Sequence, residues 1–121
     1  MNDRLRLINE GEIEMLFVDS SDLSPEEILS LLSKMRKLSL QKKIRYNILD
    51  LSNTRTSNDI KQQSQRNIQE IEAQIGKIYM ALIGLKGLQK TIANAISSRN
   101  YFAVDYSDAV RWLQERAKEH P

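Results

Sequence analysis

The sequence predicts an α/β fold in which a five-stranded mixed sheet carries four helices, in the order ββαβαβαβα. Residues 4–18 alternate apolar and polar side chains around a glycine-containing loop, as β-hairpins do. Apolar runs of strand length then alternate with helical apolar stripes, which favours right-handed crossovers between parallel strands. The chain has 121 residues, 40% of them hydrophobic and 28% charged, which fits a single domain spanning residues 1–121.

The hairpin and the first helix have the clearest local signals. We expect strands at residues 4–9 and 12–18, on either side of the loop that contains Gly11. Ser24 fits the N-cap of the following helix, Pro25 its first position and Glu27 the return partner of a capping box. An apolar stripe continues this helix to about residue 40 and consists of Ile28, Leu31, Leu32, Met35 and Leu38.

The middle of the chain predicts two more strands with a helix between them. Residues 44–51 are expected to form a strand, followed by a polar loop over 52–58. The next helix ends at Ile75, where Gly76 stops it. The nearly continuous apolar run at 78–83 predicts a strand inside the sheet, covered on both faces.

The last third of the chain predicts a helix, a short strand and a final helix. The first of these helices carries Leu88, Ile92 and Ile96, and the strand covers residues 101–104. Ser107 is expected to cap the final helix.

Composition excludes several classes of function. The chain has no cysteine, which excludes disulfides and thiolate sites, and its only histidine, His120, is next to last. A Ser-His-Asp triad or a histidine metal cluster is therefore not expected. The net charge of +2 is too small to indicate nucleic-acid binding. No signal peptide or membrane-spanning run is apparent, which favours a cytoplasmic protein.

Two aspartates, Asp19 and Asp50, fall at the ends of predicted strands, where open α/β sheets place their sites. A receiver domain also uses strand-end carboxylates, but it needs an acidic pair after its first strand, and this chain begins with a hairpin. The simpler interpretation is that these side chains close strands and cap loops.

A basic cluster lies near the end of the first helix and consists of Lys34, Arg36, Lys37, Lys42, Lys43 and Arg45. Cations there complement the helix dipole, so a solvated helix end is the simpler interpretation, with an anionic membrane or an acidic partner as the alternative. Trp112 and Phe102 could line a ligand pocket or belong to the core. Aromatic residues between a sheet and its helices are more often part of the core, which is the simpler interpretation.

The order of elements resembles the STAS family, the anti-sigma-factor antagonist-like domains, over the whole chain. Some details resemble its SpoIIAA-like branch, which is also related to lipid-carrying CRAL-TRIO (Sec14-like) domains. The segments that carry the resemblance are 18–21, 48–52 and 81–85 at strand ends, and 101–105 with 108–113 at the end of the chain.

This resemblance implies a non-enzymatic regulatory module that binds proteins, as in bacterial signalling. Phosphorylated STAS domains carry the acceptor hydroxyl at the start of the helix after the third strand. The candidates here are Thr54, Thr56 and Ser57, although the acid and the glycine of the family motif are absent. Capping of the helix by one of these hydroxyls is the competing interpretation. Residues 54–57 and the start of this helix are expected to be exposed, and the helix is expected to meet a partner through Gln62, Gln63 and Arg66.

Two functions follow, and no cofactor is expected for either. The first is a STAS-like interaction module whose partner is a protein, such as a kinase or another signalling protein. The alternative is a carrier of a lipid or other hydrophobic ligand that associates with membranes, which needs a large apolar cavity between sheet and helices. A homodimer stays open in both cases.

Overall fold

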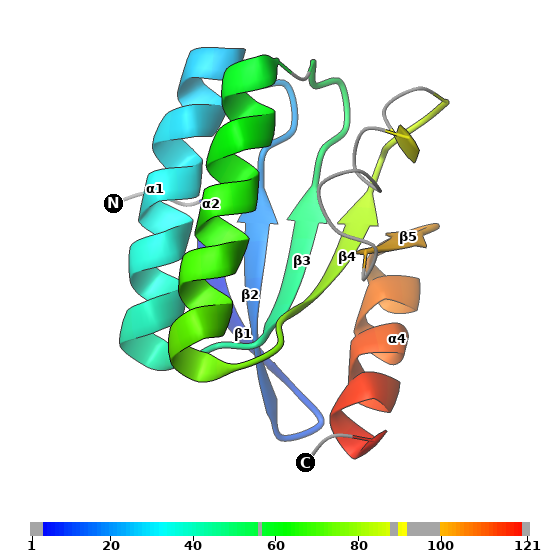
Figure 1. Cartoon of the computed structure of the whole chain (residues 1–121). Coiled ribbons are helices and arrows are strands. Elements are labelled where there is room, and N and C mark those ends of the chain that lie inside the picture. The colour runs from blue at the N-terminus through cyan, green and yellow to red at the C-terminus, as the bar shows by residue number, and fades with distance from the viewer. Residues whose placement is uncertain (1–3, 56, 88–89, 92–99, 120–121) are drawn as a thin grey trace.

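The computed structural model describes residues 4–55, 57–87, 90–91 and 100–119 (Figure 1). Its strands are β1 (Leu5–Glu10), β2 (Ile13–Asp19), β3 (Tyr46–Asp50), β4 (Tyr79–Ile83) and β5 (Asn100–Ala103). Its labelled helices are α1 (Pro25–Lys42), α2 (Asn58–Ile75) and α4 (Tyr106–Glu119). The fourth expected helix, with Leu88, Ile92 and Ile96, lies almost wholly outside the described residues. Only residues 90–91 of this segment are described, and both are helical.

The five strands form one mixed sheet in the order β1-β2-β3-β4-β5. β1 is antiparallel to β2, and each later strand is parallel to the one before it. The hairpin turn has positive φ angles at Gly11 and Glu12, 61° and 69°, as a two-residue turn between twisted strands requires. The expected α/β class and the five-stranded mixed sheet are confirmed.

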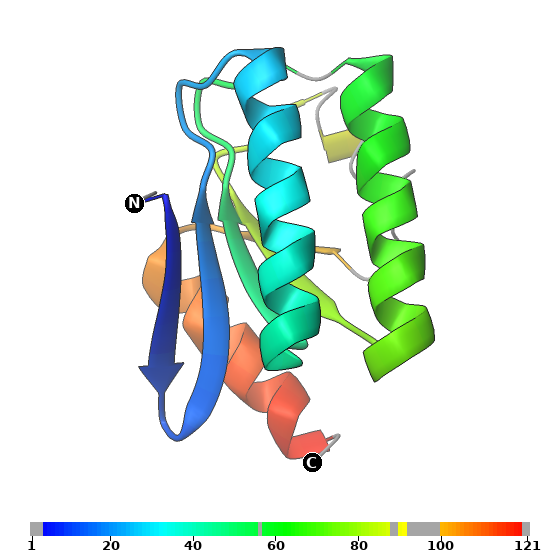
Figure 2. The ribbon, with the colours of Figure 1, turned by 90° about the vertical axis from the view of Figure 1, so that its left-hand side faces the viewer.

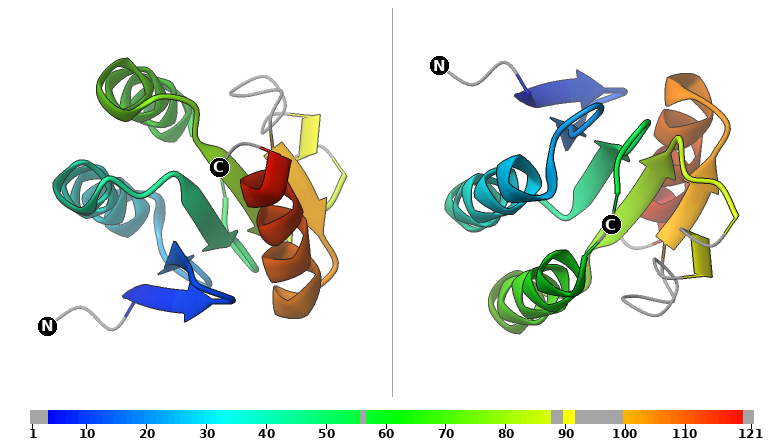
Figure 3. Two further views of the ribbon diagram at one scale, coloured as in Figure 1. Left: turned by 90° about the horizontal axis from the view of Figure 1, so that it is seen from below. Right: turned by 90° about the horizontal axis from the view of Figure 1, so that it is seen from above.

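Helices cover the sheet unequally. α1 and α2 pack on one face, and α4 packs on the other, over β3, β4 and β5 (Figure 3). The first layer buries apolar side chains from β2, β3, β4, α1 and α2, including Leu16, Val18 and Ile71. The second buries Met15, Ile48 and residues of α4 such as Leu113.

β4 confirms the interpretation of the apolar run at 78–83, because it lies between β3 and β5. Met80 and Leu82 are buried in the layer under α1 and α2, whereas Tyr79 and Ala81 are buried under α4. Both faces of this strand are therefore covered, as its composition predicts.

The caps of α1 and α4 differ in how well local sequence predicted them. At α1, Ser24 and Glu27 form the expected capping box, with Pro25 in the first turn. At α4 the expected cap, Ser107, is wrong: the Asp105 carboxylate accepts the Asp108 N–H at 2.9 Å. The Asp108 carboxylate in turn accepts the Val104 N–H at 2.9 Å. Two aspartates therefore accept backbone N–H groups in a reciprocal cap at the start of α4.

Substitution of Ser24 by alanine is expected to lower the free energy of unfolding by about 1 kcal/mol, because the Glu27 N–H loses its acceptor. Chemical denaturation measures this as a lower midpoint. Ser30→Ala, at an exposed position of the same helix, is the matched control and should leave the midpoint unchanged or raise it slightly. Equal midpoints for the two variants would contradict a stabilising capping box.

Candidate functional site

The carboxyl ends of β2, β3 and β4 meet at one edge of the sheet, where α1 and α2 also begin (Figure 1). The loops after β2 and β3 repeat one local structure there. One Asp19 carboxylate oxygen accepts the Ser21 N–H at 3.0 Å and the Ser21 hydroxyl at 2.5 Å. The corresponding oxygen of Asp50 accepts the Ser52 N–H at 3.0 Å and the Ser52 hydroxyl at 2.7 Å. Each aspartate therefore stabilises the turn of its own loop. This agrees with the simpler interpretation, in which these side chains close strands and cap loops.

The two loops are also bonded to each other. The Ser20 N–H donates to the Asp50 carbonyl at 2.9 Å, and the Asp22 N–H donates to the Ser52 carbonyl at 3.0 Å. The Asn53 amide donates to the Asp22 carboxylate at 3.0 Å. Asp22 and Asn53 both have a left-handed backbone, with φ of 61° and 54°, which suits these two residue types. The loops that lead into α1 and toward α2 therefore form one bonded unit.

The end of β4 packs directly against this unit. Gly84 has a φ of +88°, and a Cβ there would lie 2.8 Å from Ser52 Cα and closer still to the Ser52 hydroxyl oxygen. The Leu51 N–H donates to the Ile83 carbonyl at 2.8 Å, which holds the strand ends in register. Only glycine fits between the two chain segments here.

The Asp19 carboxylate has several partners at this edge of the sheet. Burial raises its pKa, but the hydrogen bonds from Ser21 and the nearby charge of Arg4 outweigh that effect and lower it below its usual value. The Arg4 guanidinium also donates to the carbonyls of Asp19 and Ser21 at 3.1 Å and 2.8 Å. Asp19 is thus an ionised structural acceptor at neutral pH and holds no proton for acid–base chemistry there.

The structure separates the three candidate hydroxyls. Thr54, expected to be exposed, is 8% exposed, and its hydroxyl donates to the Leu51 carbonyl at 2.6 Å. That expectation was wrong because the threonine closes its own turn. Ser57 is half-buried and is the N-cap of α2, where its hydroxyl oxygen accepts the Ile60 N–H at 3.2 Å. Thr56 lies outside the described residues.

The candidate interaction residues of α2 also divide into two groups. Gln62 and Arg66 are exposed and lie one helical turn apart on the outer face. Gln63 instead donates to the side chain of Asn67 at 2.7 Å, and the buried Asn67 donates to the Leu32 carbonyl of α1 at 2.9 Å. Gln63 therefore helps to join α2 to α1.

Sequence reasoning missed the residues that link the loops, namely Ser52, Asn53, Asp22 and Gly84. Their one local signal is the repeated spacing of an aspartate and a serine two residues later, in 19–21 and 50–52. Most of the remaining bonds join segments about 30 residues or more apart, as between Asn53 and Asp22, so local pattern does not reveal them.

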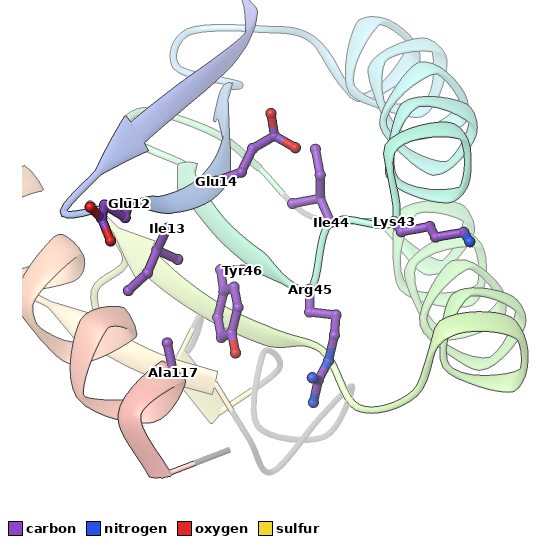
Figure 4. Close-up of a pocket in the computed structure, with 8 residues that line it drawn as sticks. All are labelled: Glu12, Ile13, Glu14, Lys43, Ile44, Arg45, Tyr46 and Ala117. Atoms are coloured by element: carbon purple, nitrogen blue, oxygen red, sulfur yellow. The ribbon is translucent and has the colours of Figure 1, made fainter. Parts of the chain in front are cut away.

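A cleft of about 410 Å³ lies at the opposite edge of the sheet, between the hairpin turn, the start of β3 and the end of α4 (Figure 4). Both charge signs line it, with Glu12 and Glu14 beside Lys43 and Arg45. The residues that line it are Glu12, Ile13, Glu14, Lys43, Ile44, Arg45, Tyr46 and Ala117.

Members of the basic cluster have separate structural roles. Arg36 pairs with Glu70 of α2 at 3.1 Å, and the Arg45 guanidinium donates to the Lys77 carbonyl at 2.8 Å. Lys43 has the left-handed backbone of a helix C-cap, with a φ of 57°. In Figure 4 the side chains of Lys43 and Arg45 point in different directions. The described geometry therefore fits a helix end better than a binding patch.

The two aromatic residues considered for a ligand pocket both pack with the core. Trp112 stacks on Tyr101 with ring centres 5.0 Å apart and meets the edge of Tyr79 at 6.3 Å. Phe102 packs against the apolar layer on the other face of the sheet. Among the residues that the structure describes, no group of three or more acidic, histidine or cysteine side chains is placed to hold a metal ion. In the same part of the chain, no helix has the length and apolar character needed to cross a membrane.

Comparison with known proteins finds a similarity in structure alone. No protein-family model matches the chain, and no curated protein matches it at a significant level. A serine-to-glutamate variant of RsbS from Moorella thermoacetica, a STAS-domain protein, superposes on it with a TM-score of 0.65. The match covers 96% of this chain and 99% of that chain at 11% sequence identity. The chain therefore has the fold of a STAS domain.

Proposed function

We propose that this chain is a non-enzymatic regulatory module of bacterial signalling that acts in the cytoplasm by binding a protein partner. The observation that carries the proposal is the junction of the hydrogen-bonded unit at the strand ends with an exposed polar helix start. We name this region the α2 surface and define it by Asn53, Arg55, Ser57, Gln62 and Arg66. Four of these are exposed, and Ser57 is half-buried at the N-cap.

Ser57 is the position at which charge would change this surface most. Its hydroxyl oxygen already accepts the Ile60 N–H, and a phosphate there would meet further N–H groups and the positive end of the helix dipole. Asp59 would oppose the added charge, and Arg55 would partly offset that repulsion. A kinase acting on Ser57 would therefore change the charge of the surface without dismantling the helix.

The carrier alternative has less support. It needs apolar space between the sheet and α1 with α2, and the described side chains there pack against one another from Leu16 in β2 to Ile71 in α2. Lipid that co-purifies with the protein, seen by native mass spectrometry, would favour that alternative over the proposal.

Site-directed crosslinking in cells tests the proposed surface. A photoreactive side chain at Gln62 is expected to capture a protein partner, whereas one at Glu115, exposed on α4 across the sheet, should not. Similar products from both positions, or none from Gln62, would contradict a partner on the α2 surface.

Three variants of Ser57 separate charge from capping. Ser57→Asn and Ser57→Asp both keep an N-cap acceptor, but only the second adds negative charge, whereas Ser57→Ala removes the acceptor at a cost of about 1 kcal/mol. We expect Asp to change the crosslinking yield from Gln62 severalfold and Asn to leave it near that of the unaltered protein. Equal yields for Asn and Asp would contradict regulation by charge at this position.

A further inference from the structure

β1 is the outer strand of the hairpin and lies at one edge of the sheet, on the side remote from β5 (Figure 2). The Asp19 N–H donates to the Arg4 carbonyl at 2.7 Å, which makes Arg4 and Asp19 a hydrogen-bonded antiparallel pair. Such pairs alternate along the ladder. The backbone groups of Leu5, Leu7 and Asn9 therefore point away from β2, toward the open edge.

This edge lacks two of the features that usually prevent edge-to-edge pairing, a bulge and a proline, although it carries the charged side chains of Arg6 and Glu10. β1 pairs with β2 over six consecutive residue pairs without a bulge, and it contains no proline. Leu7, at its centre, is 40% exposed. A regular edge strand with an apolar centre is a template for another strand.

We propose that a second copy of this chain pairs with β1, antiparallel and about a two-fold axis at Leu7, so that the two sheets become continuous. This register places Leu7 against the partner's Leu7, and Leu5 against the partner's Asn9. All three outward-facing residues of each strand then bond across the axis, which gives roughly six inter-strand hydrogen bonds.

Charge favours a second copy in this register. The two-fold axis places Arg4 opposite the partner's Glu10 at both ends of the paired strands, so that a guanidinium already bonded to Asp19 and Ser21 of its own chain also comes near a partner carboxylate. A shift of the axis to Arg6 would set two arginines against each other, which is destabilising. A shift to Ile8 would leave Leu5 opposite the hairpin turn, with about four bonds in place of six.

The dimer would leave the α2 surface accessible. β1 and α2 lie on opposite sides of the molecule in Figures 2 and 3, with α1 between them on that face. Partner binding at α2 and pairing at β1 are therefore independent, and either proposal can fail without the other.

The natural absence of cysteine allows a direct test of the register. Opposed residues of a hydrogen-bonded antiparallel pair have Cα atoms about 5.5 Å apart, within disulfide range. Under mild oxidation, Leu7→Cys is expected to form a disulfide-linked dimer. Asn9→Cys alone should not, because the two copies of residue 9 lie about 13 Å apart along the paired strands.

A mixture of Leu5→Cys and Asn9→Cys proteins should form the mixed disulfide, and sedimentation of the unaltered protein should show a dimer. Equal crosslinking of Leu7→Cys and Asn9→Cys would overturn the register, as would efficient crosslinking of Ile8→Cys. A monomer at all concentrations in sedimentation would overturn the dimer itself. It would do so even if β1 were found to pair with a strand of another protein.

Discussion

Gly84→Ala is expected to destabilise the protein by about 3 kcal/mol, the largest effect we predict for a single methyl group. A Cβ at this position would lie 2.8 Å from Ser52 Cα and from the Ser52 backbone nitrogen, so backbone must move to admit it. The left-handed φ of +88° adds a steric cost that glycine avoids. Chemical denaturation measures the loss as a lower free energy of unfolding.

Gly87→Ala is the matched control, because Gly87 also has a positive φ, +53°, but a Cβ there meets no atom of the described residues within 4 Å. We expect it to cost only about 1 kcal/mol, the strain of the backbone alone. Similar losses for the two variants would mean that contact with Ser52 adds nothing and that the three strand ends are less tightly packed than described.

Asn47→Leu should raise the free energy of unfolding by about 2 kcal/mol, in contrast to most core substitutions. Asn47 is 1% exposed in the middle of the sheet, and neither the nitrogen nor the oxygen of its side-chain amide has a hydrogen-bond partner among the described residues. Its neighbours in the adjacent strands are Leu16 and Met80. Leucine has the same branching and no polar group to bury unpaired.

The same substitution at Asn67 provides the control, with the opposite sign. Asn67 is also buried, but it accepts from Gln63 and donates to the Leu32 carbonyl. Asn67→Leu should therefore lower the free energy of unfolding by about 1–3 kcal/mol, since it leaves bonded groups without partners. If both variants lose stability alike, the amide of Asn47 makes a stabilising interaction in solution, and the prediction is wrong.

The sequence was sufficient for the fold wherever one segment carried its own signal. The capping box at Ser24 needs only residues within one turn, and the apolar run of β4 needs only its own composition. Strand and helix ends were less accurate, as at β3, which begins at Tyr46 and not at residue 44. Ile44 is buried, but it lies in the connection between α1 and β3. Its apolar side chain therefore resembled part of the strand in sequence.

The candidate site was harder to predict because its geometry depends on contacts between distant segments. Thr54 is polar, which suggests exposure, but its hydroxyl is satisfied by the Leu51 carbonyl and the residue is buried. The first turns of α2 are mostly polar in sequence, yet Ile60 is buried there, and Asn67 farther along donates to the Leu32 carbonyl of α1. Position in the chain places these side chains near the edge of the sheet, but only the packed structure shows which of them face outward.

The strand order of the sheet equals the order in which the ribosome makes the strands. Each strand can therefore pair with the one synthesised just before it, and none must insert between two that are already joined. The second layer has no such advantage, because Met15, Phe17 and Ile48 share their buried cluster with α4, which is made after all five strands. Until α4 leaves the exit tunnel, the nascent sheet exposes one apolar face, and aggregation during synthesis is the hazard that this architecture carries.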